Sequence, residues 1–445
     1  MKVVKALFLL RAGLKNTTSG SCVLLLGVLS SIVSAQTLDE AIRITLRTNP
    51  DVLASNYTVS AAEELKKQAR GGYLPRVDLV IAGGRESSNN TTTRGLGKDE
   101  LYLTRADRSL RITQMLFDGF STKSLVKQQT SLVDAAIARL GNTQETVSLR
   151  AIQVYLEVLK RGVVVDLAEE NLGHHDETLA KITERFKSGV GTKVDVVQTR
   201  GRQAQSKATL LLAQRSKKDG MAEFYRVVGE QPNALTLPTT VIGLPSTLEE
   251  VVSIALANNP GLKAIEAELE AAIAGRKQAR ASFFPRFDLE VGATRNDDND
   301  GSIGANDDES AVVRMTYNLY RGGADRARLN EAEAREFAVR EALRSSQRAV
   351  EENVTLIWNE YQDILVRSEY LEAHVKSTQE VLGVYREQLT LGKRTLLDLL
   401  DIQNELLSAQ VSKLSGDYIT LLARYKVMAS IGQLLKTLEI EPEIP

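Results

Sequence analysis

The side chains best suited to catalysis or metal binding in this 445-residue sequence are three histidines, His174, His175 and His374. Adjacent residues on a helix point about 100° apart, so His174 and His175 could not share a metal ion. His374 stands alone, and all three histidines are expected on the surface. The sequence has no Gly-x-Ser-x-Gly elbow, phosphate-binding glycine loop or zinc-ligand spacing. We therefore predict no catalytic residue, no cofactor and no enzymatic activity.

The segment 296–307 offers a second kind of chemistry, because it nearly fits a twelve-residue calcium loop. Asn296, Asp298 and Asp300 occupy positions one, three and five, a glycine occupies position six, and Asp307 occupies position twelve. The segment departs from that pattern in its first residue, in its short final acid and in its strand-like flanks. Two interpretations stay open: a solvated acidic tip, or a loop that binds Ca²⁺ weakly.

A third candidate is a short turn that occurs twice, 203 residues apart. The two copies are Gly189, Thr192 and Asp195, and Gly392, Thr395 and Asp398. Glycine ends a helix readily because it adopts the left-handed conformation at no steric cost. Threonine caps the next helix, and the aspartate favours the positive end of the helix dipole. Each copy is therefore predicted to be a tight turn between two antiparallel helices.

The repeated turn belongs to a duplication that spans most of the chain. Asn49-Pro50 recurs as Asn259-Pro260, and Tyr73-Leu74-Pro75 recurs as Phe283-Phe284-Pro285, at an offset of 210 residues. Farther on, Leu116-Phe117-Asp118-Gly119 matches Leu319-Tyr320-Arg321-Gly322 at an offset of 203. The offset changes between the two expected strands, where a loop absorbs insertions. We predict a first structural repeat at 36–235, a second at 247–432 and a non-helical tail at 433–445.

Each repeat is expected to contain two helices, a β-hairpin and a long helical hairpin. Asn-Pro pairs separate the helices, and period-two alternation of apolar and polar residues marks the strands. The predicted ranges are 38–48, 50–71, 248–258 and 260–282 for the helices, about 76–117 and 286–320 for the β-hairpins, and about 120–229 and 324–430 for the helical hairpins. Tyr317 and Leu319 are included in the last strand. The first arm of each helical hairpin would span roughly 100 Å.

The first 35 residues have the pattern of a signal peptide, with a basic start, an apolar run and small residues before Gln36. Removal of the four basic residues of this segment would leave 52 basic and 57 acidic side chains, a net charge near −5. No basic face dominates, which argues against nucleic acid as a partner. The single cysteine, Cys22, lies early in this segment and not at its end, so lipidation is not predicted.

Strands of about ten residues with one apolar face are long enough to cross a bilayer when tilted. Their edges cannot stay unpaired in lipid, so they would have to close into a barrel. Four strands per chain are too few for a single-chain barrel, so two, three or four chains would have to combine. The alternative from another class is a periplasmic coiled-coil scaffold without a pore.

The order of these features resembles the TolC-type outer membrane factors. The resemblance is carried by the repeated layout, the junctions at 73–75 and 116–119, and the two Gly-Thr-Asp turns, and it covers essentially the whole mature chain. It implies an α+β membrane protein in the bacterial outer membrane. Three chains would form a twelve-stranded transmembrane β-barrel, continued into the periplasm by an α-helical barrel of duplicated long-helix coiled coils.

The resemblance also implies partners and a use. The homotrimer would contact outer-membrane lipid, dock on a periplasmic adaptor (membrane fusion) protein and an inner-membrane ABC or RND transporter, and conduct substrates passively. Because lipidation is not predicted, type I protein secretion is favoured over multidrug efflux, which stays the alternative.

Residue roles at the turns follow from the same resemblance. Asp398 and Asp401 match acidic positions at the periplasmic constriction, where three copies of each would favour cations. Arg394 matches an arginine that links helices, and Asp195 is its expected partner. Leu389 departs from the family, because a tyrosine is common at that position. The hairpin tips expected to dock on the adaptor are marked by Gly189, Thr192, Gly392 and Thr395.

Overall fold

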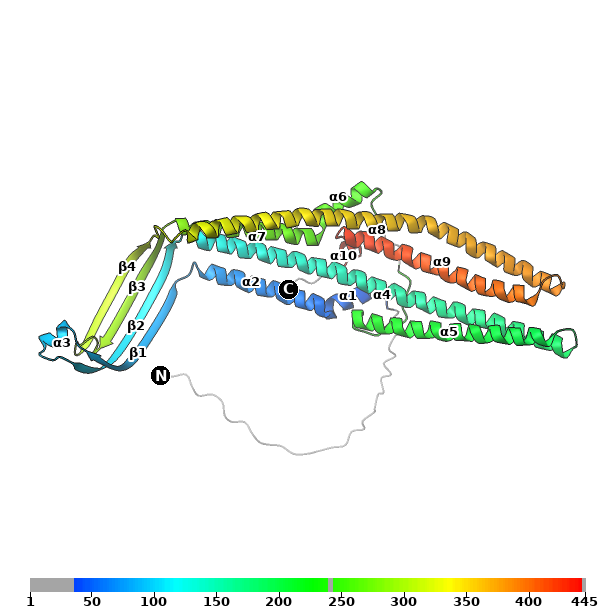
Figure 1. Ribbon diagram of the computed structural model, residues 1–445, viewed down its shortest axis with the longest axis horizontal. Helices are drawn as coiled ribbons and strands as arrows, with labels where there is room; N and C mark the ends of the chain where they lie inside the picture. The colour runs from blue at the N-terminus through cyan, green and yellow to red at the C-terminus, as the bar shows by residue number, and fades with distance from the viewer. Residues whose placement is uncertain (1–35, 239–242, 442–445) are drawn as a thin grey trace, which may run out of the picture. The chain divides into compact units, whose positions relative to one another are not determined.

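The computed structural model describes residues 36–238 and 243–441. The predicted signal peptide at 1–35 lies outside the described residues. The described residues form two similar series of helices, strands and a long helical hairpin (Figure 1). The first series is α1 (Leu38–Thr48), α2 (Pro50–Gly71), β1 (Arg76–Ser88), α3 (Thr91–Gly95), β2 (Leu101–Phe117), α4 (Ser121–Lys187) and α5 (Lys193–Val228). The second series is α6 (Leu248–Asn258), α7 (Pro260–Arg280), the 3-10 turn η1 (Ala281–Phe283), β3 (Arg286–Asp297), β4 (Ala305–Thr316), α8 (Ala324–Thr390), α9 (Leu396–Ser430) and α10 (Leu434–Thr437).

The four strands form one antiparallel sheet in the order β1-β2-β3-β4. The register aligns four apolar residues in one row across the sheet, namely Val77, Ile112, Val291 and Ala311. Successive side chains point to opposite faces, so the other face carries Asp78, Arg111, Glu290 and Arg314. Leu79 and Val313 on the apolar face are 67% and 62% exposed. The sheet is therefore amphipathic, and its apolar face is open in the single chain.

The last strand is shorter than predicted. β4 ends at Thr316, so Tyr317 and Leu319 lie outside the strand that was expected to reach about 320. Thr316 pairs with Arg286, the first residue of β3. Pro285 precedes Arg286 and has no N–H to donate, so the ladder stops there. Beyond this point the chain turns through Gly322 and Gly323, which both have positive φ.

Two uninterrupted helices, α4 and α8, have 67 residues each, and α5 and α9 run back beside them (Figure 1). α2, α5, α7 and α9 pack against α4, while α8 packs against α7 and α9. The helices and the four strands agree with the expected α+β fold class. Within the described ranges, no helix is both long enough and apolar enough to cross a membrane.

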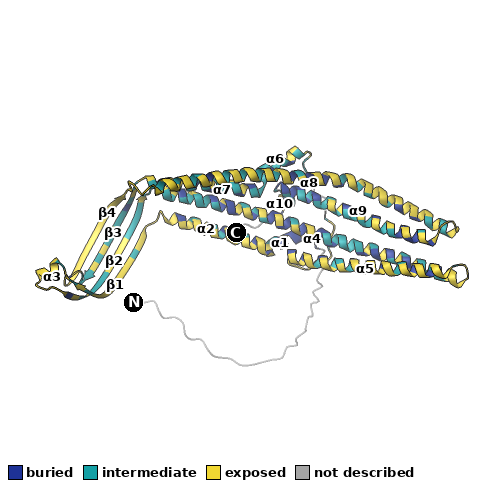
Figure 2. Cartoon of the chain, in the orientation of Figure 1, coloured by how far each residue is buried: buried dark blue, intermediate teal, exposed yellow. Residues whose placement is uncertain are grey.

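The largest core of the described residues lies midway along α4 and α8, beside the C-terminal ends of α5 and α9, where both repeats meet (Figure 2). Tyr155 of α4 and Phe224 of α5 come from the first repeat, and Trp358 of α8 and Tyr425 of α9 come from the second. All four side chains are at most 9% exposed. Burial of each such side chain contributes roughly 1.5–3 kcal/mol. This layer therefore holds the two repeats together.

The Asn-Pro junctions of the two repeats share two hydrogen bonds of the asparagine side chain. The Asn49 side chain accepts from the Asp51 N–H and donates to the Val227 carbonyl at 3.3 Å. Asn259 accepts from the Gly261 N–H and donates to the Ser430 carbonyl, also at 3.3 Å. Each asparagine thus caps one helix and contacts the end of the returning helix of its own repeat.

The C-terminal segment is not entirely non-helical, contrary to the prediction for 433–445. Leu434–Thr437 forms the short helix α10, and Leu434 and Leu435 are buried. Their N–H groups donate to the carboxylate of Glu145 on α4 at 3.1 and 3.3 Å. Burial of the two leucines and capping by a distant carboxylate explain the helix, and neither is a local sequence signal. Pro442 and Pro445 lie outside the described residues.

Candidate functional site at the helical hairpin tips

The two hairpin tips have the same backbone geometry. Gly189 and Gly392 adopt φ values of 79° and 70°. The residue after each glycine donates its N–H back to the last turn of the incoming helix, from Val190 to Arg185 at 3.0 Å and from Lys393 to Gln388 at 2.9 Å. This pattern is the Schellman ending of a helix, which requires a left-handed residue at the glycine position. The predicted helix-terminating role of both glycines is confirmed.

Both outgoing helices begin with a capping box. The Thr192 hydroxyl accepts from the Asp195 N–H at 3.2 Å, and the Asp195 carboxylate accepts from the Thr192 N–H at 3.1 Å. Thr395 and Asp398 repeat the arrangement at 3.3 and 3.2 Å. Hydrogen bonds from the Thr395 hydroxyl and N–H, with a contribution from nearby Arg394, lower the pKa of the Asp398 carboxyl. The predicted caps are confirmed, and the lowered pKa keeps the Asp398 carboxyl ionised at neutral pH while it caps the helix.

Arg394 does not pair with Asp195 in the described chain, contrary to expectation. Its guanidinium donates to Gln388 at 3.2 Å, lies 3.7 Å from the Asp398 carboxylate and stacks 4.4 Å from the centre of the Tyr385 ring. Arg394 therefore stays within its own hairpin, where a side-chain amide, a carboxylate four residues away and an aromatic face hold its guanidinium.

Asp401 forms an ion pair that the sequence reasoning missed. Nη2 of Arg202 on α5 lies 2.5 Å from Oδ1 of Asp401 on α9. The pair connects the two helical hairpins of one chain. Its members are 199 residues apart, so no local pattern could have identified it.

Below the ion pair, toward the tips, the hairpins meet in an apolar cluster. Ile182 of α4, Val196 of α5 and Leu400 of α9 are buried together there. Leu389, the position where the family commonly has a tyrosine, is partly buried against the same cluster. Leu389 therefore makes an apolar contact at the position where a tyrosine is common in the family.

Above the ion pair lies a buried polar layer. The Ser206 hydroxyl of α5 donates to Asn171 of α4 at 2.8 Å, and the Asn171 amide donates to the Gln403 carbonyl of α9 at 3.4 Å. His175 of α4 is fully buried and lies 3.3 Å from the Asn404 side-chain oxygen. The prediction of a surface position for His175 was therefore wrong.

The burial of His175 has a sequence signal that could have been used. Ala168, Asn171, His175 and Ile182 follow each other at intervals of three, four and seven residues, and all four are buried. This spacing places them on one helix face. Burial, followed by the approach of Arg202 and His174, lowers the pKa of His175, although the Asn404 contact opposes the shift.

In the candidate calcium loop at 296–307, the expected ligands are engaged in contacts within the protein. The Asp298 carboxylate accepts from the Gly304 N–H at 2.8 Å, and Asp307 lies 3.7 Å from Arg295 within the strand pair. Asp300 is anchored through its carbonyl, which accepts from the Asn90 side chain at 2.7 Å. Among the described residues, no three histidine, cysteine or acidic side chains gather to hold a metal ion. Asn296 pairs with Asn306 in the ladder, and Asp307 pairs with Arg295. Asn296 and Asp307 therefore point to opposite faces of the sheet.

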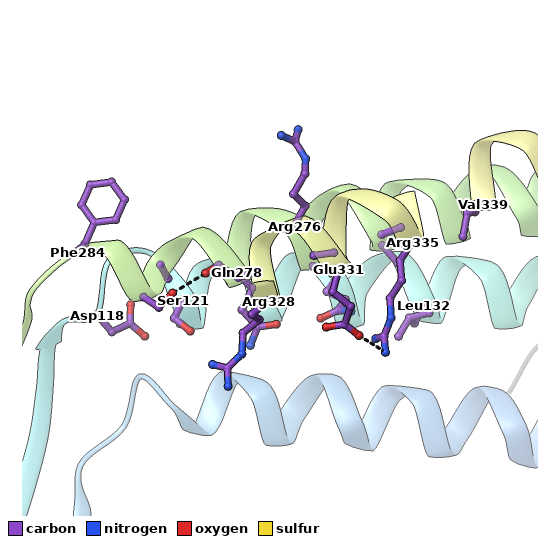
Figure 3. Close-up of a pocket in the computed structure, with 18 of the residues that line it drawn as sticks. Asp118, Ser121, Leu132, Arg276, Gln278, Phe284, Arg328, Glu331, Arg335 and Val339 are labelled. Carbon is purple, nitrogen blue, oxygen red and sulfur yellow. Dashed lines mark hydrogen bonds and ion pairs between the residues drawn. The ribbon is translucent and has the colours of Figure 1, made fainter. Parts of the chain in front are cut away.

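A cavity of about 920 Å³ lies where α4, α7 and α8 approach the sheet (Figure 3). Its charged lining is largely paired: Arg335 contacts Glu331 at 2.5 Å, and Arg276 contacts Glu336 at 2.7 Å. The lining contains no histidine or cysteine. Because these charges are paired within the protein, we interpret the cavity as a structural junction between the helices and the strands.

A four-stranded sheet joined to long helical hairpins is a fold that this chain shares with outer membrane proteins of known structure. The chain belongs to the outer membrane efflux protein family, whose model matches residues 41–230 and 251–433. The protein is therefore placed in the outer membrane, and the resemblance to TolC-type factors is confirmed.

Named relatives include both efflux and secretion proteins. The chain is 24% identical to the outer membrane efflux protein BepC of Brucella suis, over 90% of this chain and 86% of that protein. It is 25% identical to the alkaline protease secretion protein AprF of Pseudomonas aeruginosa, over 87% and 83%. The structure also resembles the outer membrane protein VceC of Vibrio cholerae, with a TM-score of 0.74, 19% identity, and coverage of 89% and 96%.

Proposed function

We propose that three copies of this chain form a passive, non-catalytic exit duct in the outer membrane. The observation that carries this proposal is the amphipathic sheet, whose first and last strands each pair on one side only within the chain. Joining β4 of one copy to β1 of the next would satisfy those edges and enclose twelve strands. The apolar face would then contact lipid, and the polar face would line the duct.

The hairpin tips are the proposed docking points for a periplasmic adaptor protein and, through it, an inner-membrane transporter. Val190, Val194 and Leu391 at the tips are 70%, 62% and 67% exposed. Apolar side chains at an exposed helix end suit contact with another protein. Gly189, Thr192, Gly392 and Thr395 would act by holding these tips in shape.

The same proposal assigns the constriction to Asp398 and Asp401, near the start of α9. Purified wild-type protein in planar bilayers is expected to show a small, cation-selective conductance that divalent cations block. The double variant Asp398→Ala plus Asp401→Ala is expected to weaken selectivity and divalent block. Unchanged conductance in the variant would move the constriction elsewhere. Failure of well-folded protein to insert or conduct would favour a coiled-coil scaffold without a pore.

For cargo, we propose type I protein secretion, supported by the similarity to AprF over most of both chains. Drug efflux is the second candidate, supported by the similarity to BepC. Expression in a bacterium that lacks its own duct would separate them. Restored export of a type I protein substrate without restored drug resistance supports secretion, and the reverse result supports efflux.

A further inference from the structure

The acidic residues assigned to the constriction are both matched by arginines of the same chain. Asp398 lies 3.7 Å from Arg394, and Asp401 lies 2.5 Å from Arg202. The second pair is the closer one, and its guanidinium comes from the other helical hairpin. α5 and α9 both pack on α4 and contact each other far less, so this ion pair is a principal direct link between them.

The position of Arg202 is fixed by buried neighbours on its own helix. Thr199 and Ser206, three residues before and four after Arg202, are 0% and 4% exposed. These intervals place all three residues on one face of α5, toward α4 and α9. The Arg202 side chain is 31% exposed, less than the 55% of Asp401. Arg202 is therefore anchored at the interface, while the Asp401 carboxylate reaches toward solvent.

We propose that Arg202 is a selectivity-determining residue that offsets the charge of Asp401 and holds α5 against α9. This inference rests on the proposed function as a duct. In a trimer, three Asp401 carboxylates would each have a guanidinium within contact distance. The net negative charge at the constriction would then depend on how far Arg202 neutralises the Asp401 carboxylate. The number of aspartates alone would not determine it.

Removal of Arg202 should unmask Asp401. Two unit charges about 4 Å apart interact by about 1 kcal/mol in water and more near a protein surface, and a charge of either sign at a pore constriction changes ion permeability. Arg202→Gln is therefore expected to raise the cation-to-anion permeability ratio about two- to fivefold. Asp401→Asn should lower the ratio, because it leaves Arg202 unpaired, and the double variant should return close to the wild-type value.

Arg200→Gln is the matched control. Arg200 is an exposed arginine on the same helix, and two helical positions separate it from Arg202 by about 200° around the axis. The measurement is the reversal potential of single channels under a salt gradient. A change in Arg202→Gln that exceeds the change in Arg200→Gln, and that Asp401→Asn cancels, supports the proposal. Equal effects of the two arginine variants overturn it.

A cross-linking experiment tests the Arg202–Asp401 contact without a conductance measurement. Cys22 is the only cysteine, so Arg202→Cys plus Asp401→Cys in a Cys22→Ser background provides two unique thiols. A short bismaleimide should join them within one chain, giving a cross-linked peptide pair and no cross-linked dimer. Links only between chains, or none, would overturn the Arg202–Asp401 contact. An intrachain link in a variant that does not conduct even before cross-linking would instead refute the duct and leave the contact standing.

Discussion

Glu145 is the side chain whose environment gives the sharpest pH prediction. It lies on α4, is 9% exposed and accepts from the N–H groups of Leu434 and Leu435 at the start of α10. Burial raises the pKa of its carboxyl from 4.5 to about 7, and the two backbone hydrogen bonds only partly oppose the shift. Glu145 therefore connects the docking of the C-terminal segment to pH.

The direction of the pH dependence of docking follows from the raised pKa of Glu145. Below about pH 4.5 the carboxyl is protonated whether the segment is docked or released, so its stabilising contribution is fully present. Between pH 4.5 and about 7 the released form loses its proton first, and docking becomes less favourable as pH rises. The shift corresponds to about 3 kcal/mol, or roughly a hundredfold or more in the opening equilibrium. Above pH 7 the loss is complete.

Hydrogen–deuterium exchange of residues 430–441, corrected for the intrinsic effect of pH, measures this opening equilibrium. Wild-type protection should fall by about two orders of magnitude between pH 5 and pH 8. Glu145→Gln keeps one accepting oxygen and cannot ionise, so its protection should be nearly independent of pH and higher than wild type at pH 8. Glu157→Gln is the control, because Glu157 pairs with Lys160 and Arg161 on the same helix at 2.7 and 2.8 Å. Equal pH slopes for wild type and Glu145→Gln would refute the reasoning.

Three further predictions concern the hairpin interface. Gly392→Ala should destabilise the folded protein by about 1–2 kcal/mol, because φ is 70° there. Gly383 on the same hairpin has open space around it, so Gly383→Ala should stabilise the folded protein by up to about 1 kcal/mol. Chemical denaturation compares the two variants, and equal effects would contradict the turn geometry. Thr395→Ala should cost about 1 kcal/mol through loss of the cap, and Thr395→Ser should restore most of it. The pKa of His175 should lie below 6.5 in an NMR titration of labelled histidines, because burial disfavours protonation of the ring. The interface around His175 should therefore lose stability as pH falls through 6.5. A measured pKa at or above 6.5 would contradict its burial.

The sequence by itself determined the elements that depend on neighbouring residues. The Gly392 and Thr395 signals placed the second tip correctly, because a left-handed glycine and a capping hydroxyl act within a few residues. Asn49 and Asn259 likewise marked helix boundaries, since proline restricts the residue before it. The repeated order of these local signals was sufficient to identify the fold class.

Only the tertiary structure decided which side chains meet across helices. Arg202 reaches Asp401, His175 is buried against Asn404, and Glu145 caps a segment 289 residues away. Such contacts depend on the rotation and axial position of each long helix, and a helix face repeats along its length without specifying its partner. The same limit explains why Arg394 was assigned to Asp195 and was found on Asp398 instead. Residues close to each turn determine the geometry of the hairpin tips, and helix packing determines which side chains pair between the hairpins.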